Sequence, residues 1–157
     1  YIQLQQPDLS QYIYDLLEQE GIPGEAIILE LTESMQLQDY TKYNQLFYQW
    51  GKRGIQISMD DFGSGYSSLN ALKDILFDEV KIDKRFLSDD LSENGKIVLQ
   101  EIFHLLRRTN KSIVCEGVET KEMVDFLVEE GCDELQGYYY YKPMSQSAFE
   151  KLLENIV

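Results

Sequence analysis

Long apolar runs are missing from this sequence, and so is any stretch with the pattern of a secretory signal peptide. A membrane-spanning helix needs about 18 or more apolar residues in succession. We therefore expect nothing in these 157 residues to cross a membrane. The protein is predicted to be cytoplasmic, although regions outside this sequence could anchor it to a membrane.

Basic residues are few, with 14 lysines and arginines against 28 aspartates and glutamates, which gives a net charge of -14. They also form no cluster along the sequence. Since DNA and RNA polymers are bound by clustered basic side chains that neutralise phosphates, we expect no such partner. A single phosphorylated ligand held by metal ions stays compatible with this charge, because bound cations reverse the local sign.

Cysteine and histidine are scarce as well. Cys115 and Cys132 are too few for a disulfide framework and lack the spacing of a zinc site, so we expect both to be reduced core residues. His104 is the only histidine, and its position within a helical pattern predicts a structural role. No linker, repeat or low-complexity segment divides the chain, which predicts one domain over residues 1–157.

Helix-like and strand-like patterns alternate along the chain. The predicted strands are 26–32, 55–59, 79–83, 112–115 and 135–141. The predicted helices are 8–20, 38–52, 67–76, 91–109 and 120–130. A last helix follows, where Ser147 and Glu150 have the spacing of a capping box. Alternation with short connections predicts right-handed βαβ units and a parallel sheet.

Polar side chains lie at or near the end of each predicted strand. They are Glu30 and Glu33, Asp60 and Asp61, Lys81 and Asp83, Glu116 and Glu119, and Gln136. In a barrel of parallel strands these ends converge on one face, where active sites form. The predicted fold is therefore α/β, a TIM-type (β/α)8 barrel that is incomplete here, with about five βα units against eight in the full fold.

The stretch MDDFGSGYSSL from Met59 to Leu69 places two carboxylates side by side at a strand end. Asp60 and Asp61 repel each other unless a cation or a proton is shared between them. The glycines that follow let the backbone turn sharply enough to approach a metal ion, which takes oxygen ligands. Alone, a DDFG run is equally typical of a solvated turn, but the other strand ends favour a cation site.

Five motifs occur in a fixed order along the chain: ELTES, DDFGSGYSSL, KIDKRF, EGVET and QGYYYYKP. Together they resemble the EAL domain of bacterial cyclic di-GMP phosphodiesterases, and QLQQPDL near the start resembles the segment after that family's third strand. The Glu-Ala-Leu signature, with its metal ligand and substrate-binding arginine, and the Asn-x-Ser metal motif would lie upstream of Tyr1. The resemblance thus implies the last five-eighths of an EAL domain, truncated at its N-terminus.

This resemblance implies hydrolysis of cyclic di-GMP to linear 5′-pGpG with two divalent cations, Mg²⁺ or Mn²⁺. Glu30 and Asp60 resemble ligands of the first metal ion. Asp60 would also bridge to the second ion, on which Asp61 would be a ligand. With two upstream ligands absent, we expect these 157 residues alone to be inactive.

Further roles are implied by the same resemblance. Lys81 is similar to a lysine that holds the attacking water, and Glu116 to a general base or a contact of the second metal ion. Gln136 would hydrogen-bond the groups around the metal ions without adding charge. Glu33 resembles an anchor for the loop after the paired aspartates, and Glu119 either an outer residue of the site or a structural one.

Two functions stay open. An enzyme is favoured because every catalytic position visible in the sequence is intact, but some family members are non-catalytic receptors for cyclic di-GMP or for a partner protein. The resemblance also implies a homodimer and, in the parent protein, sensor or GGDEF domains. One tyrosine of 138–141, a run predicted to alternate across a strand, could stack on a guanine.

Overall fold

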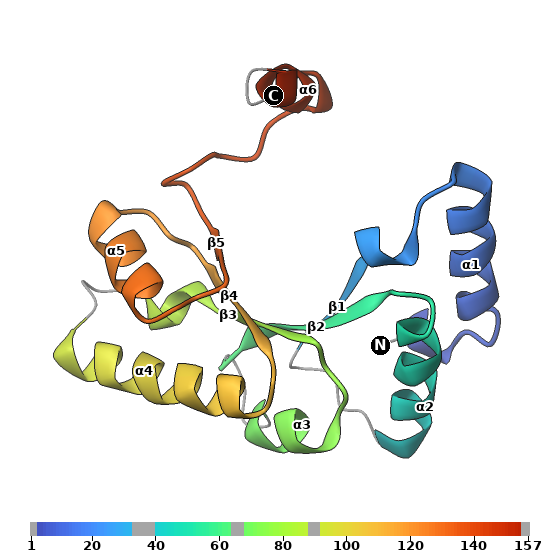
Figure 1. Ribbon diagram of the computed structural model, residues 1–157, viewed down its shortest axis with the longest axis horizontal. Coiled ribbons are helices and arrows are strands. Elements are labelled where there is room, and N and C mark those ends of the chain that lie inside the picture. Colours follow the sequence, from blue (N-terminus) through green and yellow to red (C-terminus); the bar gives the residue numbers. More distant parts are fainter. Residues whose placement is uncertain (1–2, 33–39, 64–67, 88–91, 155–157) are drawn as a thin grey trace.

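The computed structural model describes residues 3–32, 40–63, 68–87 and 92–154. Its centre is a parallel sheet of five strands in the order β1-β2-β3-β4-β5 (Figure 1). The strands are β1 Ile28–Thr32, β2 Gln56–Phe62, β3 Glu79–Ile82, β4 Ser112–Glu116 and β5 Glu134–Gln136. The predicted α/β fold with about five βα units is confirmed.

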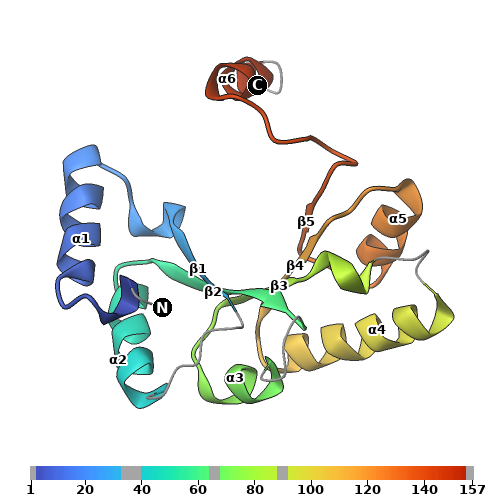
Figure 2. The same ribbon diagram turned by 180° about the vertical axis from the view of Figure 1, so that it is seen from behind.

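Helices alternate with these strands as predicted. They are α1 Leu9–Glu20, α2 Tyr40–Gly51, α3 Ser68–Asp74, α4 Glu93–Arg108, α5 Lys121–Glu129 and α6 Gln146–Glu154, with short 3₁₀ turns at Gln3–Gln5, Gly24–Ala26 and Lys84–Phe86. Helices α2 to α5 lie around one side of the sheet, and α6 lies apart on the opposite side (Figures 1 and 2). None of the helices within the described residues is long and apolar enough to span a bilayer.

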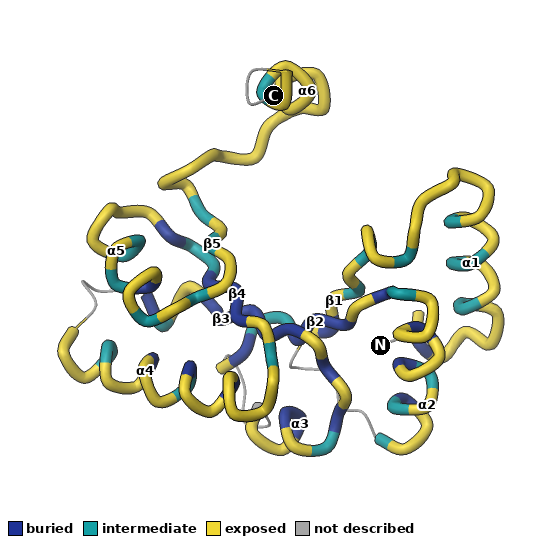
Figure 3. The backbone as a smooth tube through the Cα atoms, in the orientation of Figure 1, coloured by how far each residue is buried: buried dark blue, intermediate teal, exposed yellow. Residues whose placement is uncertain are grey.

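The core lies between the sheet and its surrounding helices, where the buried positions gather (Figure 3). Alternate strand residues point to this side, because side chains on a strand face opposite ways in turn. Those of the three central strands are Ile57, Met59, Val80, Ile82, Ile113 and Cys115. Large side chains from the helices pack against them, chiefly Phe47, Trp50, Leu99, Phe103, Leu106 and Leu127. The other side of the strands is left for polar side chains.

Two aspartates fix the register of alternate strands with the same pair of hydrogen bonds. Asp78, just before β3, accepts from the Ile57 amide through its carboxylate at 2.8 Å and donates its own amide to the Ile57 carbonyl at 2.9 Å. Asp133, just before β5, does the same with Ile113 at 2.8 and 3.0 Å. Each aspartate therefore holds the start of its own strand against the strand before the intervening helix.

Two predicted strands end several residues away from their expected ends, whereas the other ends agree to within one residue. Strand β2 continues past Met59 to Phe62, so Asp60 and Asp61 lie inside it, and its register with β3 shifts between Met59 and Phe62. Asp61 has a φ of 58°, a left-handed conformation that bends the strand at this point. The carboxylate pair thus belongs to a distorted strand end and not to the loop that follows.

The predicted strand 135–141 is wrong beyond Gln136. Gly137 lies so close to Val118 that a Cβ there would be 2.1 Å from the Val118 carbonyl oxygen, and the chain leaves the sheet at this residue. Tyr139 then donates to the Val118 carbonyl at 3.0 Å in a turn. The four tyrosines that follow Gly137 do not alternate across a strand, and all are exposed.

The capping box predicted from Ser147 and Glu150 is also wrong. Helix α6 already begins at Gln146, which makes Ser147 its second residue. The Ser145 carbonyl accepts the first helical bonds, from Ala148 and Phe149, both at 3.0 Å. The spacing was right for a capping box, but the helix begins earlier in the sequence.

The register aspartates give a stability prediction. Asp133→Ala leaves the Ile113 amide without its carboxylate acceptor and should lower the free energy of unfolding by about 1 kcal/mol. Asp125→Ala is the matched control, because its carboxylate only pairs with Lys121 on the surface of α5 and should cost no more than about 0.5 kcal/mol. Urea unfolding followed by circular dichroism measures both. Equal losses for the two variants would contradict the register role of Asp133.

Candidate active site

The amine of Lys81 lies at the centre of the polar side of the sheet. Its Nζ atom is 2.8 Å from Glu30 Oε1 and 2.5 Å from Glu116 Oε1. Asp60 Oδ1 is a third neighbour at 3.8 Å. These carboxylates come from β1, β4 and β2, so one ammonium group on β3 joins four strands.

Lys81 is held as a cation by this surrounding. Its side chain is only 9% exposed. Burial by itself lowers the pKa of Lys81, but the hydrogen-bonded carboxylates of Glu116 and Glu30 outweigh that effect, so the pKa lies above its usual value. The positive charge therefore persists at neutral pH, where it offsets part of the surrounding negative charge.

Three carboxylates form a compact cluster beside Lys81. Asp60, Asp61 and Glu116 each offer one oxygen, and these three oxygens lie within 4.8 Å of one another. Burial raises the pKa of Asp61, and the neighbouring carboxylates of Asp60 and Asp83 raise it further. The Asp61 backbone amide donates to Asp60 Oδ1 at 2.9 Å, which fixes the Asp60 side chain against the backbone of Asp61.

This cluster fits a divalent cation. Its donors are all carboxylate oxygens, the ligand type that Mg²⁺ and Mn²⁺ prefer. Burial, and after it the neighbouring carboxylates of Asp60 and Asp83, raise the pKa of Asp61, so negative charge on Asp61 is disfavoured in this cluster. A bound cation would relieve the repulsion between the adjacent aspartates.

Asp83 supports the cluster from the end of β3. Its Oδ1 atom accepts from the Arg85 amide at 2.7 Å and from Arg85 Nε at 3.0 Å, and Oδ2 accepts from Arg85 Nη2 at 3.2 Å. These bonds, above all the side-chain ones, lower the pKa of Asp83. The negative charge of Asp83 also raises the pKa of Asp61, so Asp83 connects Arg85 electrostatically to the paired aspartates. The sequence placed Asp83 at a strand end but gave it no role.

Glu79 lies on the same side of β3 as Lys81, two residues earlier, and is buried. Burial raises the pKa of its carboxyl group. The nearby charge of Glu134 raises that pKa further, while the ammonium of Lys81 acts in the opposite direction. Sequence inspection missed this acid because it lies at the start of a strand, away from the rim where such groups were sought.

The remaining predicted site residues do not belong to the cluster of Asp60, Asp61 and Glu116. Glu30 contacts Lys81 but is not one of the three clustered carboxylates, and Gln136 is the register partner of Glu116 on β5. Glu119 is exposed in the β4–α5 loop, and no hydrogen bond or ion pair found among the described residues joins it to the cluster. Glu33 lies outside the described residues.

The other candidates from the sequence lie apart from the cluster. His104 is on the exposed surface of α4. Cys115 is fully buried on the core side of β4, and Cys132 is half-buried; neither forms a disulfide. Tyr138 lies under the Lys142 ammonium, 5.4 Å from the ring centre.

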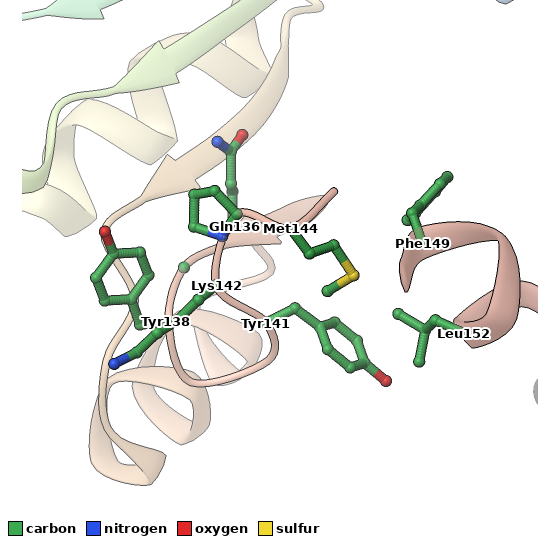
Figure 4. A pocket seen from close by; sticks show the side chains of 9 residues that line it. Gln136, Tyr138, Tyr141, Lys142, Met144, Phe149 and Leu152 are labelled. Carbon is green, nitrogen blue, oxygen red and sulfur yellow. The ribbon is translucent and has the colours of Figure 1, made fainter. Parts of the chain in front are cut away.

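A pocket of about 380 Å³ opens between the end of β5 and α6. Figure 4 shows Tyr141, Met144 and Leu152 facing one another across it, with Phe149 beside Leu152 on α6 and Gln136 at the β5 end. The lining is mostly apolar and contains no residue of the carboxylate cluster. The pocket therefore extends from the rim of the site along an exposed apolar face.

Comparison with known proteins identifies the family. Residues 2–143 match the sequence profile of the EAL domain, and the chain belongs to the EAL domain family. PdeI of Escherichia coli, named a probable cyclic di-GMP phosphodiesterase, is 35% identical over 153 residues, 95% of this chain and 19% of PdeI. The chain thus spans about a fifth of the length of the curated relatives it matches.

Two solved structures have the same fold. The EAL domain of Mycobacterium smegmatis DcpA superimposes with a TM-score of 0.92 at 30% identity, over 98% of this chain and 70% of that one. The Pseudomonas aeruginosa MucR phosphodiesterase in complex with cyclic di-GMP has a TM-score of 0.83 at 34% identity, over 94% of this chain and 60% of that one. Both chains extend beyond the part that this one matches.

The Asp83–Arg85 contact predicts a pH dependence of stability. A lowered native pKa of Asp83 stabilises the fold at pH values above the unfolded pKa of about 4, and this stability is lost as pH falls through the native pKa. Asp83→Asn should therefore be less stable than the parent by about 1 kcal/mol near pH 7, and the difference should shrink toward about pH 3.

Chemical unfolding of both proteins across this pH range measures the difference. The difference in stability between the parent and Arg85→Gln should also shrink as pH falls, because this substitution removes the cation that lowers the pKa of Asp83. A gap between parent and Asp83→Asn that stayed constant from neutral to acid pH would show that Asp83 stabilises the fold without its charge.

Proposed function

We propose that this chain is the catalytic part of a phosphodiesterase that hydrolyses cyclic di-GMP to linear 5′-pGpG. The main support is the contact of the Lys81 ammonium with carboxylates from three other strands, beside the adjacent pair Asp60 and Asp61. The family and the cyclic di-GMP complex of a 34%-identical relative agree with this substrate. EAL domains are metal-dependent, and the acidic cluster meets that requirement.

Two divalent cations, Mg²⁺ or Mn²⁺, are proposed as cofactors. Glu30 and Asp60 would hold the first, and Asp60 and Asp61 the second, with Glu116 as base or further ligand. Such ions polarise a phosphodiester and lower the pKa of a bound water. Glu30 contacts Lys81 and is not one of the three clustered carboxylates, so its proposed role requires a change in the conformation of its half-exposed side chain.

Two side chains of this protein have proposed roles in the chemical step. The Glu116 carboxylate accepts a proton from the water that attacks phosphorus, a role that requires it beside the metal ligands. The Lys81 ammonium donates hydrogen bonds toward the water and the phosphate oxygens, where negative charge develops. Burial keeps Lys81 aimed at this position, and Gln136, next to Glu116 on β5, orients the same water.

The domain is proposed to be five units of an eight-unit EAL barrel. The open edges of the sheet support this, since Ile28 on β1 and the tyrosines after β5 are exposed. Helix α6 has no buried residue, and its apolar side chains Phe149 and Leu153 are also exposed. Upstream βα units would cover these surfaces. A homodimer and additional sensor or GGDEF domains in the parent protein are part of the same proposal.

Substitutions at Asp60 and Glu116 should have different effects in the parent protein, whose barrel is complete. Glu116→Gln should lower the rate of cyclic di-GMP hydrolysis at least about 100-fold, because the amide cannot accept the proton. Binding of the dinucleotide should persist. Asp60→Asn should instead weaken Mn²⁺ binding by at least about tenfold. Release of 5′-pGpG by chromatography and titration calorimetry with Mn²⁺ give the two values.

Glu122→Gln is the matched control, since Glu122 is an exposed glutamate on α5 outside the cluster. It should hydrolyse cyclic di-GMP at the parental rate. If Glu116→Gln did so too, the proposed base would be wrong. Binding of cyclic di-GMP without hydrolysis by the parent protein would favour the alternative, a non-catalytic receptor.

The exposed edges predict association of the isolated 157-residue chain. Light scattering after size exclusion should give a mass that rises with concentration above the 18.4 kDa of one chain. Replacing Phe149 and Leu153 by serine should reduce the association, because it removes apolar surface from α6. Val98→Ser, which removes an exposed apolar side chain from α4 and not from α6, should have no such effect. A concentration-independent monomer would contradict the open-barrel proposal.

A further inference from the structure

A second pocket lies at the end of the sheet opposite the carboxylate cluster. It has a volume of about 390 Å³ and is formed by the last turn of α2, the start of β2 and the segment between α3 and β3. Its apolar lining comes from Phe47, Tyr48, Ile57, Leu76 and Phe77. None of these residues has a role in the chemistry proposed for the other end of the strands.

The wall between α3 and β3 is fixed in place by side chains from other segments. Asn44 on α2 donates through Nδ2 to the Asp74 carbonyl at 2.7 Å and accepts through Oδ1 from the Leu76 amide at 2.9 Å. The amine of Lys111 donates to the Phe77 carbonyl. The pocket is thus preformed, so a ligand does not have to order this segment, which lowers the cost of binding.

Two amines, those of Lys52 and Lys111, lie on the lining of this pocket, in a chain with 14 basic and 28 acidic residues. Lys52 Nζ lies 4.6 Å from the centre of the Tyr48 ring. Among the described residues that line the pocket, Asp78 is the only acid, and its Oδ2 atom accepts from the Ile57 amide at 2.8 Å. The lining therefore carries more positive than negative charge, in contrast to the chain as a whole.

The Lys111 amine has donors left for a ligand. Lys111 is half-buried, and the one hydrogen bond found for its amine within the described residues goes to the uncharged Phe77 carbonyl. An ammonium group has three N–H donors. Burial lowers the pKa of Lys111, and the negative charge of Asp78 offsets only part of that effect. An anion beside the amine would stabilise its charged form.

We propose that this pocket binds a small aromatic anion, in which one ring carries a carboxylate or a phosphate group. The ring packs against the exposed side chains of Tyr48 and Leu76. The acidic group accepts charge-assisted hydrogen bonds from Lys52 and Lys111. A volume of about 390 Å³ lies at the lower end of the range for ligand sites, which favours a single ring over a dinucleotide. The site is therefore distinct from the one proposed for cyclic di-GMP.

Nuclear magnetic resonance of the ¹⁵N-labelled chain, titrated with phenyl phosphate or with phenylacetate, tests the site. At least one of the two anions should bind with a Kd of about 1 mM or lower, as ligands of this size can. The tighter of the two identifies the acidic group. Amide shifts should change at Tyr48, Phe77 and Lys111. Inorganic phosphate, which has no ring, and benzylamine, whose ring carries a cation, should each bind at least about tenfold more weakly.

Substitutions in the lining should weaken binding of the better anion. Lys111→Gln should raise its Kd at least about fivefold, because the charge is lost, whereas Lys111→Arg should keep most of the affinity. Tyr48→Ser should also raise the Kd, and since Tyr48 is exposed this variant does not depend on how Lys111→Gln folds. Lys96→Gln is the matched control, because Lys96 lies on α4 outside the pocket, where it pairs with Glu93. Its Kd should equal that of the parent.

Equal affinity for benzylamine and phenylacetate would overturn the proposal, because the two amines would then not select an anion. Amide shifts confined to α6 or to the carboxylate cluster would overturn it as well. So would the absence of binding by either anion at about 10 mM, ten times the expected Kd. None of these measurements depends on hydrolysis of cyclic di-GMP, so they decide the site whether or not the proposed phosphodiesterase function holds.

Discussion

The ammonium group of Lys81 is the interaction on which the site depends. Carboxylates from β1, β2 and β4 converge on it at 2.5 to 3.8 Å, in a protein whose net charge is -14. Without a buried cation, the acids at the rim would repel one another and take up protons. The parallel sheet supplies the geometry, because it directs the carboxyl ends of neighbouring strands to one edge. One amine therefore connects the fold to the chemistry proposed for it.

A second constraint lies behind the cluster, in the backbone. The left-handed conformation of Asp61 bends the end of β2, where Asp60 and Asp61 lie next to each other. At the end of β3, Asp83 is fixed by hydrogen bonds from Arg85. The Asp78 and Asp133 bonds fix the strand register at the other end of the sheet. The carboxylates that repel one another thus lie at the rim, whereas the Asp78 and Asp133 bonds at the bottom of the sheet involve no such repulsion. A similar separation of function from stability is general in parallel barrels.

Most of the architecture was predictable from local sequence patterns. Five strands alternate with helices where the apolar periodicity placed them, because each element must bury one face against the same core. The exceptions are local backbone effects: the left-handed Asp61 lengthens β2, and the close approach of Gly137 to Val118 ends β5 early. Neither effect is visible in the spacing of apolar residues along the sequence. The sequence therefore predicts a strand for the tyrosine run, although the structure forms a turn there.

The sequence by itself determined which acids, amide and amine could form a site, since the end of each parallel strand delivers them to a common rim. Only the tertiary structure decided which of them meet. Asp60, Asp61 and Glu116 cluster, Glu30 is joined to them through Lys81, and Glu119 points to solvent. It also revealed the contact of Asp83 with Arg85 and the buried Glu79. The reason is that strand order and face follow from periodicity, whereas contact distances depend on register, twist and the bend at a single residue.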